Sequence, residues 1–138
     1  MLPTPLYLDD ALIAVDKPAG LLAVPGRGAD KQDCMWTRVQ VHWPDAQVVH
    51  RLDMATSGLM LFARGLAVQR SLSQAFAERR VAKQYIAVAD GRMAEMQGRV
   101  ELPLAADWPR RPLQRVDADG RAARTDWQLL EQIGRAHV

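Results

Sequence analysis

A carboxylate with the potential for chemistry stands at Asp53, two residues after Arg51. It is followed closely by Thr56, Ser57 and Gly58. The apolar runs on either side predict strands, so we expect Asp53 to lie in the loop between them. Small hydroxyls and a glycine favour a tight turn whose backbone N–H groups can face a ligand. An ionised aspartate in such a turn can act as a nucleophile or as a general base.

The spacing of Arg51 and Asp53 has two interpretations. A neighbouring guanidinium favours the ionised form of a carboxylate, which suits catalysis. The same two residues also fit an ion pair that does no more than hold a loop in place. The Arg-x-Asp spacing alone favours the second interpretation, and longer motifs are needed to decide.

The complete run VHRLDMATSGLMLFA, residues 49–63, contains the string H-R-L-D-x-x-T-S-G-L. This string resembles the signature of the RluA family of RNA pseudouridine synthases. VDKPAGL at 15–21 resembles the family's K-P-x-G element, and VAKQYIA at 81–87 resembles its K-x-Y strand. The resemblance covers roughly residues 6–131. Shorter matches, VPGR at 24–27, TR at 37–38 and DWP at 107–109, indicate the branch that modifies both 23S rRNA and tRNA.

The resemblance implies an isomerase that detaches uracil from its ribose, turns it over and rejoins it through carbon, without cofactor or metal. Asp53 would attack the sugar or abstract a proton from it, and both routes remain open. Arg51 would fill the gap left by the flipped-out base and offset part of the unstacking cost. Tyr85 would stack on the target base or protect the chemistry, although a strand aromatic also fits plain core packing.

The residues that we assign to RNA binding lie in the three motifs and along a basic helix. Arginine and lysine there would contact phosphates, which predicts RNA affinity that falls steeply with salt. A solvated helix face is the alternative for the basic residues, and a purely structural turn is the alternative for the lysine of K-P-x-G. Trp108 is a further candidate for stacking on RNA. The assigned residues are His50, Thr56, Ser57, Lys17, Arg70, Arg79, Arg80 and Lys83.

The composition is that of an ordinary globular chain, with 49% hydrophobic and 25% charged residues among 138. No apolar run is long enough to span a membrane, and no signal peptide is recognisable. Cys34 is the single cysteine, which excludes an internal disulfide and suits a reducing cytoplasm. The net charge of +2 is modest, but 15 of the 18 basic residues are arginine. Residues 1–63 have a balance of −2 and residues 64–138 a balance of +4.

The hydrophobic pattern predicts short strands with a few helices. Residues 6–8 and 12–16 should pair as strands around a turn at 9–10, and residues 59–63 should form a buried strand. A helix capped by Asp33 should run to about residue 43. The clearest helix spans about residues 66–80, because Val68, Leu72, Ala75 and Phe76 share one face. Further strands are predicted at 84–89, 100–104 and 122–130.

These elements predict an α+β fold, with a mostly antiparallel mixed sheet and flanking helices. By resemblance, residues 1–132 are the N-terminal part of one pseudouridine synthase catalytic domain whose second half is missing. The last residues, IGRAHV at 133–138, match the translation of one frame of a common sequencing adapter. We therefore expect 133–138 to be foreign and the 138-residue chain to be inactive on its own.

Two other classes of function are compatible with parts of the sequence. The first is an inactive RNA-binding fragment of the same fold. In the family, an arginine of the second half pairs with the catalytic carboxylate, and by resemblance that half is missing here. The second is a DNA-binding protein that uses the helix at 66–80, but no helix-turn-helix spacing supports it. We expect a monomer that binds structured RNA, with neither DNA nor a membrane as partner.

Overall fold

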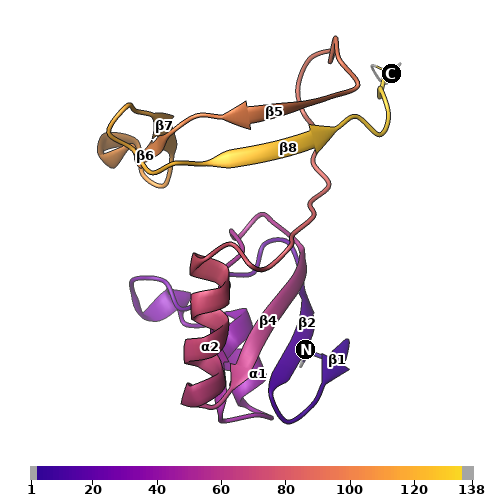
Figure 1. Ribbon diagram of the computed structural model, residues 1–138. Helices are drawn as coiled ribbons and strands as arrows, with labels where there is room; N and C mark the ends of the chain where they lie inside the picture. The colour runs from indigo at the N-terminus through magenta and orange to yellow at the C-terminus, as the bar shows by residue number, and fades with distance from the viewer. Residues whose placement is uncertain (1–2, 135–138) are drawn as a thin grey trace. The chain divides into compact units, whose positions relative to one another are not determined.

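The computed structural model describes residues 3–134, and the chain divides into two compact units between Tyr85 and Ile86 (Figure 1). The first unit contains two helices and a sheet, and the second contains two antiparallel strand pairs. In chain order, the helices and strands are β1 (Tyr7–Leu8), β2 (Leu12–Lys17), α1 (Met35–Gln40), β3 (Ala46–Val48), β4 (Gly58–Arg64), α2 (Leu66–Ala77), β5 (Gln97–Glu101), β6 (Leu104–Ala106), β7 (Gln114–Val116) and β8 (Arg124–Gln128), with short 3-10 segments at Ala29–Lys31 and Trp108–Arg110.

The sheet of the first unit has the order β1-β2-β4-β3, and each neighbouring pair is antiparallel. Its centre is the long β2–β4 pairing, which runs from Leu12 opposite Ala63 to Lys17 opposite Gly58. β3 pairs only with the C-terminal part of β4, from Phe62 to Arg64. The N-terminal part of β4, which begins at Gly58, therefore extends beyond the end of β3. This uneven edge is where the candidate loop begins.

The core of the first unit lies between this sheet and α1. Ile13, Val15, Met60 and Phe62 come from β2 and β4 and are fully buried, and Val39 of α1 joins them. Each such side chain contributes about 1.5–3 kcal/mol of hydrophobic stabilisation relative to an exposed one. The central strands are therefore a rigid base for the loops at their ends.

The α2 helix lies alongside β4 (Figure 1). The predicted apolar stripe is confirmed, because the four residues of that face are half-buried whereas most of the remaining helix is exposed. The helix ends at Ala77, earlier than predicted. Arg79 adopts a left-handed backbone (φ 57°) and donates to the Phe76 carbonyl, while Arg80 donates to that of Ala75. These two bonds form a Schellman motif, which closes the helix without the usual glycine.

Two predicted elements were wrong in detail. Cys34, not Asp33, is the N-cap of α1, and Thr37 completes a capping box with it. Asp33 instead forms a bidentate ion pair with Arg38 at 2.7–2.8 Å, which the sequence pattern did not reveal. The segment 84–89 is not a strand in the structure, because no neighbouring strand pairs with it. Its apolar residues are exposed, with Ile86 at 85%.

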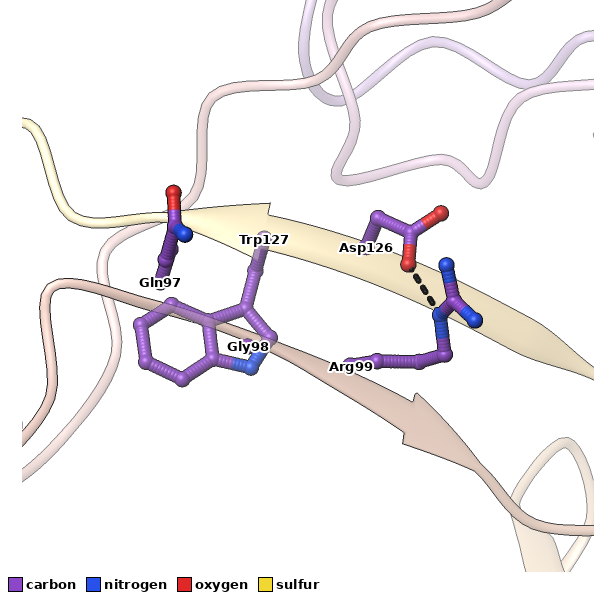
Figure 2. A pocket seen from close by; sticks show the side chains of 5 residues that line it. All are labelled: Gln97, Gly98, Arg99, Asp126 and Trp127. Carbon is purple, nitrogen blue, oxygen red and sulfur yellow. Dashed lines mark hydrogen bonds and ion pairs between the residues drawn. The ribbon is translucent and has the colours of Figure 1, made fainter.

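The second unit is built from the pairs β5–β8 and β6–β7. Gly98 lies opposite Trp127, and the indole covers the glycine so closely that an added Cβ would lie 2.7 Å from the ring (Figure 2). Beside them, Arg99 and Asp126 form an ion pair at 2.6 Å across the strands. Among residues 86–134, Asp107 is the one side chain that is buried. Cross-strand pairs, not a core, hold this unit together.

The fold class is confirmed as α+β with antiparallel sheets. The sequence missed the β6–β7 pair, because three-residue strands leave too short a pattern to detect. Within the described residues, no helix has both the length and the hydropathy that a membrane span needs. The prediction of a single catalytic domain over 1–132 stays a prediction. Of the suspected foreign tail, residues 135–138 lie outside the described part of the chain.

Candidate active site

The candidate site is the loop of residues 49–57, which leaves the sheet after β3 and returns to it at β4. Leu52 in the middle of this loop is only 8% exposed and belongs to the hydrophobic core. Its neighbours Arg51 and Asp53 are both exposed. A single buried leucine thus anchors the loop and turns the guanidinium and the carboxylate on either side toward solvent.

Immediately after Asp53, the backbone carbonyl of Met54 is held by two hydrogen bonds. The oxygen of Met54 accepts hydrogen bonds from the Gly20 N–H at 2.7 Å and from Lys17 Nζ at 3.2 Å. The Thr56 N–H donates to the Asp53 carbonyl at 3.0 Å, which closes a turn. These bonds fix the backbone on which the carboxylate stands and join it to the K-P-x-G turn.

Lys17 is fully buried, and its ammonium donates to two further carbonyls, of Pro18 at 2.9 Å and of Leu21 at 2.6 Å. Burial lowers the pKa of Lys17, and the negative charge of Asp53 opposes that shift. The RNA-binding assignment that we gave Lys17 from sequence does not suit this position, because the ammonium is enclosed by protein oxygens. The structural alternative for the lysine of K-P-x-G accords with the geometry.

His50 lies on the N-terminal side of the loop and is half-buried. Its Nε2 accepts a hydrogen bond from the Leu61 N–H of β4 at 2.9 Å. Its ring stacks on Phe76 of α2, with centroids 4.7 Å apart and planes 16° apart. Burial lowers the pKa of His50, and the positive charge of Lys83 lowers it further. The imidazole is therefore neutral near pH 7.

Arg51 and Asp53 do not form an ion pair among the residues that the structure describes. The alternative in which an ion pair between Arg51 and Asp53 holds the loop in place is therefore not what the structure shows. Thr56 is half-buried and Ser57 is exposed, and both follow Asp53 on the same loop. Within residues 3–134, no cluster of three or more His, Cys, Asp or Glu side chains forms a metal site.

Tyr85 is the last residue of the first unit, and its side chain is 61% exposed. Core packing, the alternative interpretation of this aromatic, is not seen. Within the described chain, no hydrogen bond joins its hydroxyl to Asp53. The structure thus leaves Tyr85 accessible to a partner.

The four basic residues near α2 are all exposed. Arg70 lies on the helix, and Arg79, Arg80 and Lys83 follow its C-terminus. Arg80 is paired with Glu78 at 2.6 Å, so part of its charge is already neutralised. Arg79 tolerates a left-handed backbone that is costly for any residue with a Cβ.

Sequence reasoning missed the residues that hold the loop, namely Leu52, Phe76 as the stacking partner of His50, and the Met54 carbonyl. Leu52 was detectable in principle, since it is the one apolar side chain within H-R-L-D. The Met54 oxygen carries no side-chain signal at all. The pocket in Figure 2 lies in the second unit and is lined by Gln97, Gly98, Arg99, Asp126 and Trp127, none of which was a candidate.

Comparisons with known proteins agree with these motifs. Residues 11–137 match the family model described as RNA pseudouridylate synthase. The dual-specificity RNA pseudouridine synthase RluA of Vibrio parahaemolyticus is 45% identical over 92% of this chain and 51% of its own length. The Escherichia coli K12 protein of the same name is 46% identical over 91% of this chain and 58% of its own length. The chain thus spans about half the length of the curated relatives it matches.

Solved structures show the same fold. Human RNA Pseudouridylate Synthase Domain Containing 4 superposes with a TM-score of 0.73 at 22% identity, over 94% of this chain and 54% of that one. Human RNA Pseudouridylate Synthase Domain Containing 1 gives a TM-score of 0.65 at 20% identity, over 90% and 49%. Because the family model matches residues 11–137, nearly the whole of this chain, the chain belongs to the RNA pseudouridylate synthase family.

Proposed function

We propose that the chain is part of an enzyme that converts uridine to pseudouridine in RNA, with Asp53 as the catalytic carboxylate. The observation that carries the proposal is the presentation of Asp53. It is exposed on a loop whose two sides are bonded to the sheet and whose centre is anchored by buried Leu52. Holding a reactive group in place before substrate arrives lowers the entropic cost of reaction.

Asp53 would act either as a nucleophile on the sugar or as a base that removes a proton from it. Both roles need an ionised, accessible carboxylate. Arg51, exposed on the other side of Leu52, would enter the space vacated by the flipped uridine. Tyr85, accessible at the end of the first unit, would stack on the target base. No cofactor is needed for either route.

The substrate class that we propose is structured RNA, with 23S rRNA and tRNA as the targets. Support comes from the relatives, which are named dual-specificity RNA pseudouridine synthases. Thr56 and Ser57 would contact the RNA beside the carboxylate, and Arg70, Arg79, Arg80 and Lys83 would contact phosphates. Removing one true phosphate contact reduces the slope of log affinity against log salt by about 1.

The test of catalysis joins residues 1–132 to the remaining C-terminal part of the Escherichia coli relative, because this chain covers about half of such proteins. Pseudouridine is measured by mass spectrometry of 23S rRNA and tRNA transcripts. Asp53→Asn should reduce the rate by at least about 10³-fold while RNA affinity stays within a factor of a few. Asp16→Asn, at an exposed carboxylate of β2, is the matched control and should leave the rate unchanged.

A catalytically inactive RNA-binding fragment is the competing function. For the 138-residue chain alone, it predicts RNA binding without pseudouridine. If the wild-type chimaera forms no pseudouridine, or if Asp53→Asn forms it at an undiminished rate, the catalytic proposal fails. Loss of RNA affinity in Asp53→Asn would instead make the aspartate a binding residue.

A further inference from the structure

The edge of β4 beside His50 lacks a strand partner over part of its length. β3 pairs with β4 only as far as Val48 opposite Phe62. In the described chain, the N-terminal part of β4, from Gly58 to Leu61, has no partner strand on the β3 side. It is paired only with β2, on the opposite side. An N–H at such an edge needs a partner, since a buried unpaired donor costs about 1–3 kcal/mol.

The His50 imidazole supplies that partner. Its Nε2 lies 2.9 Å from the Leu61 nitrogen and accepts the hydrogen bond that a carbonyl of a continued β3 would otherwise accept. Phe76 of α2 covers one face of the ring, with the two planes only 16° apart. The ring is therefore fixed in two directions, by a hydrogen bond in the plane of the sheet and by stacking against the helix.

We infer that His50 is the positioning residue of the Asp53 loop, acting as a neutral hydrogen-bond acceptor that extends the β4 ladder by one side chain. The inference rests on the proposed role of Asp53. His50 is three residues before Asp53, and Leu52 between them enters the core. With the Met54 carbonyl held by Gly20 and Lys17, the carboxylate is bonded to the sheet from both sides.

This role requires a particular protonation state. An imidazole nitrogen that accepts a hydrogen bond carries no proton, so the neutral ring must hold its proton on Nδ1. Protonation of Nε2 would replace the acceptor with a donor facing the Leu61 N–H. The elements packed on the ring contribute Leu61 and Phe76, which do not titrate, and Lys83 is the charged group that acts on it. Both its charge and the burial favour the neutral form.

Protonation of His50 at low pH should lower the stability of the folded chain. The pKa of His50 is lowered in the folded chain, so the unfolded chain takes up the proton first as pH falls. Stability therefore decreases as pH drops below the ordinary histidine value. The loss is complete once pH passes below the lowered pKa. The order of the Asp53 loop should be lost over the same range, before the core of β2 and β4 is affected.

The experiment is heteronuclear NMR on the full 138-residue chain, labelled with ¹⁵N. At pH 7.5 we expect an unprotonated Nε2 on His50 and a through-hydrogen-bond coupling between that nitrogen and the Leu61 amide. As pH falls, the Leu61 amide and those of residues 53–58 should titrate together with His50. A proton on Nε2, or loop signals that do not follow His50, would overturn the inference.

Two variants separate positioning from simple packing. His50→Gln keeps an acceptor that does not titrate, so the loop amides should retain their shifts and lose their pH dependence. His50→Phe keeps a ring against Phe76 without an acceptor, so Leu61 should exchange faster and the loop signals broaden. His42→Gln, at an exposed histidine, should change neither. If His50→Phe leaves the loop signals unchanged, the hydrogen bond has no positioning role.

None of these measurements needs turnover, so their failure is distinct from failure of the proposed function. In the chimaera described above, His50→Gln should restore most of the kcat that His50→Phe loses, with KM affected less than kcat. An active Asp53→Asn chimaera would refute the catalytic proposal while the NMR result for His50 stood.

Discussion

The two units of this chain are stabilised in different ways. In residues 3–85, thirteen apolar residues are buried in or around one core, and the candidate loop is bonded directly to that core. In residues 86–134, Asp107 is the single buried side chain, and apolar residues such as Trp108 and Val116 are 60–65% exposed. The carboxylate that we propose as catalytic therefore stands on the unit that has a packed core.

A second difference concerns charge. Arginines of the second unit are repeatedly paired with nearby carboxylates, as in Arg99–Asp126 and Arg115–Asp117. Exposed pairs of this kind contribute little stability, about 0–1 kcal/mol each. Such pairs cannot replace a core, so we expect the second unit to open more readily than the first.

The largest contrast should come from truncating a core aromatic. Phe62→Ala removes a fully buried ring from β4 and should lower the free energy of unfolding of the first unit by about 3–5 kcal/mol. Val100→Ala in β5, where the side chain is 48% exposed, should cost no more than about 0.5 kcal/mol. Urea titrations monitored by circular dichroism measure both. Equal losses would contradict the contrast between the units.

The next effect should come from the buried ammonium. Lys17→Met retains the length of the side chain but leaves the carbonyls of Pro18, Leu21 and Met54 without their donor. We expect a loss of about 1–3 kcal/mol and disorder of the Asp53 loop. Lys31→Met, at an exposed lysine, is the control and should be close to neutral. Chemical denaturation gives the stability, and amide shifts of residues 53–58 report the loop.

The smallest effect should arise in the second unit. Gly98→Ala places a methyl group against the Trp127 indole, which must shift to admit it. Because that ring lies at the surface, we expect a cost of about 1 kcal/mol, at the low end of overpacking effects. Gly134→Ala meets no atom within 4 Å and serves as control. Amide exchange across β5 and β8 is the measurement, and an unchanged rate in Gly98→Ala would show that the indole does not stabilise the pair.

Features that leave a periodic pattern or a motif in the sequence were predicted correctly. The α2 stripe, the β1–β2 pair and the buried β4 followed from residue patterns, and the candidate loop followed from H-R-L-D-x-x-T-S-G-L. The interior position of Lys17 did not, because a lysine between a strand and Pro18 has no pattern that distinguishes a phosphate ligand from a donor to backbone oxygens. The neutral acceptor role of His50 also required the geometry, since it depends on where β3 ends.

The strand predicted at 84–89 failed for a related reason. Its run of apolar residues has the composition of a strand, but a strand requires a partner to bond with. In the described chain no strand lies beside it. Local propensity therefore identified a segment suited to a sheet without being able to supply its neighbour.

We expect the Asp53 loop to be held by the rigid first unit before any RNA binds. Residue-resolved amide hydrogen exchange on the 138-residue chain tests this most directly. The N–H groups of Gly20, Thr56 and Leu61 donate hydrogen bonds that hold the loop. Their amides should exchange nearly as slowly as the amides that join β2 to β4, and far more slowly than those of β6 and β7. Exchange of these three amides at the rate of the second unit would contradict a preorganised loop.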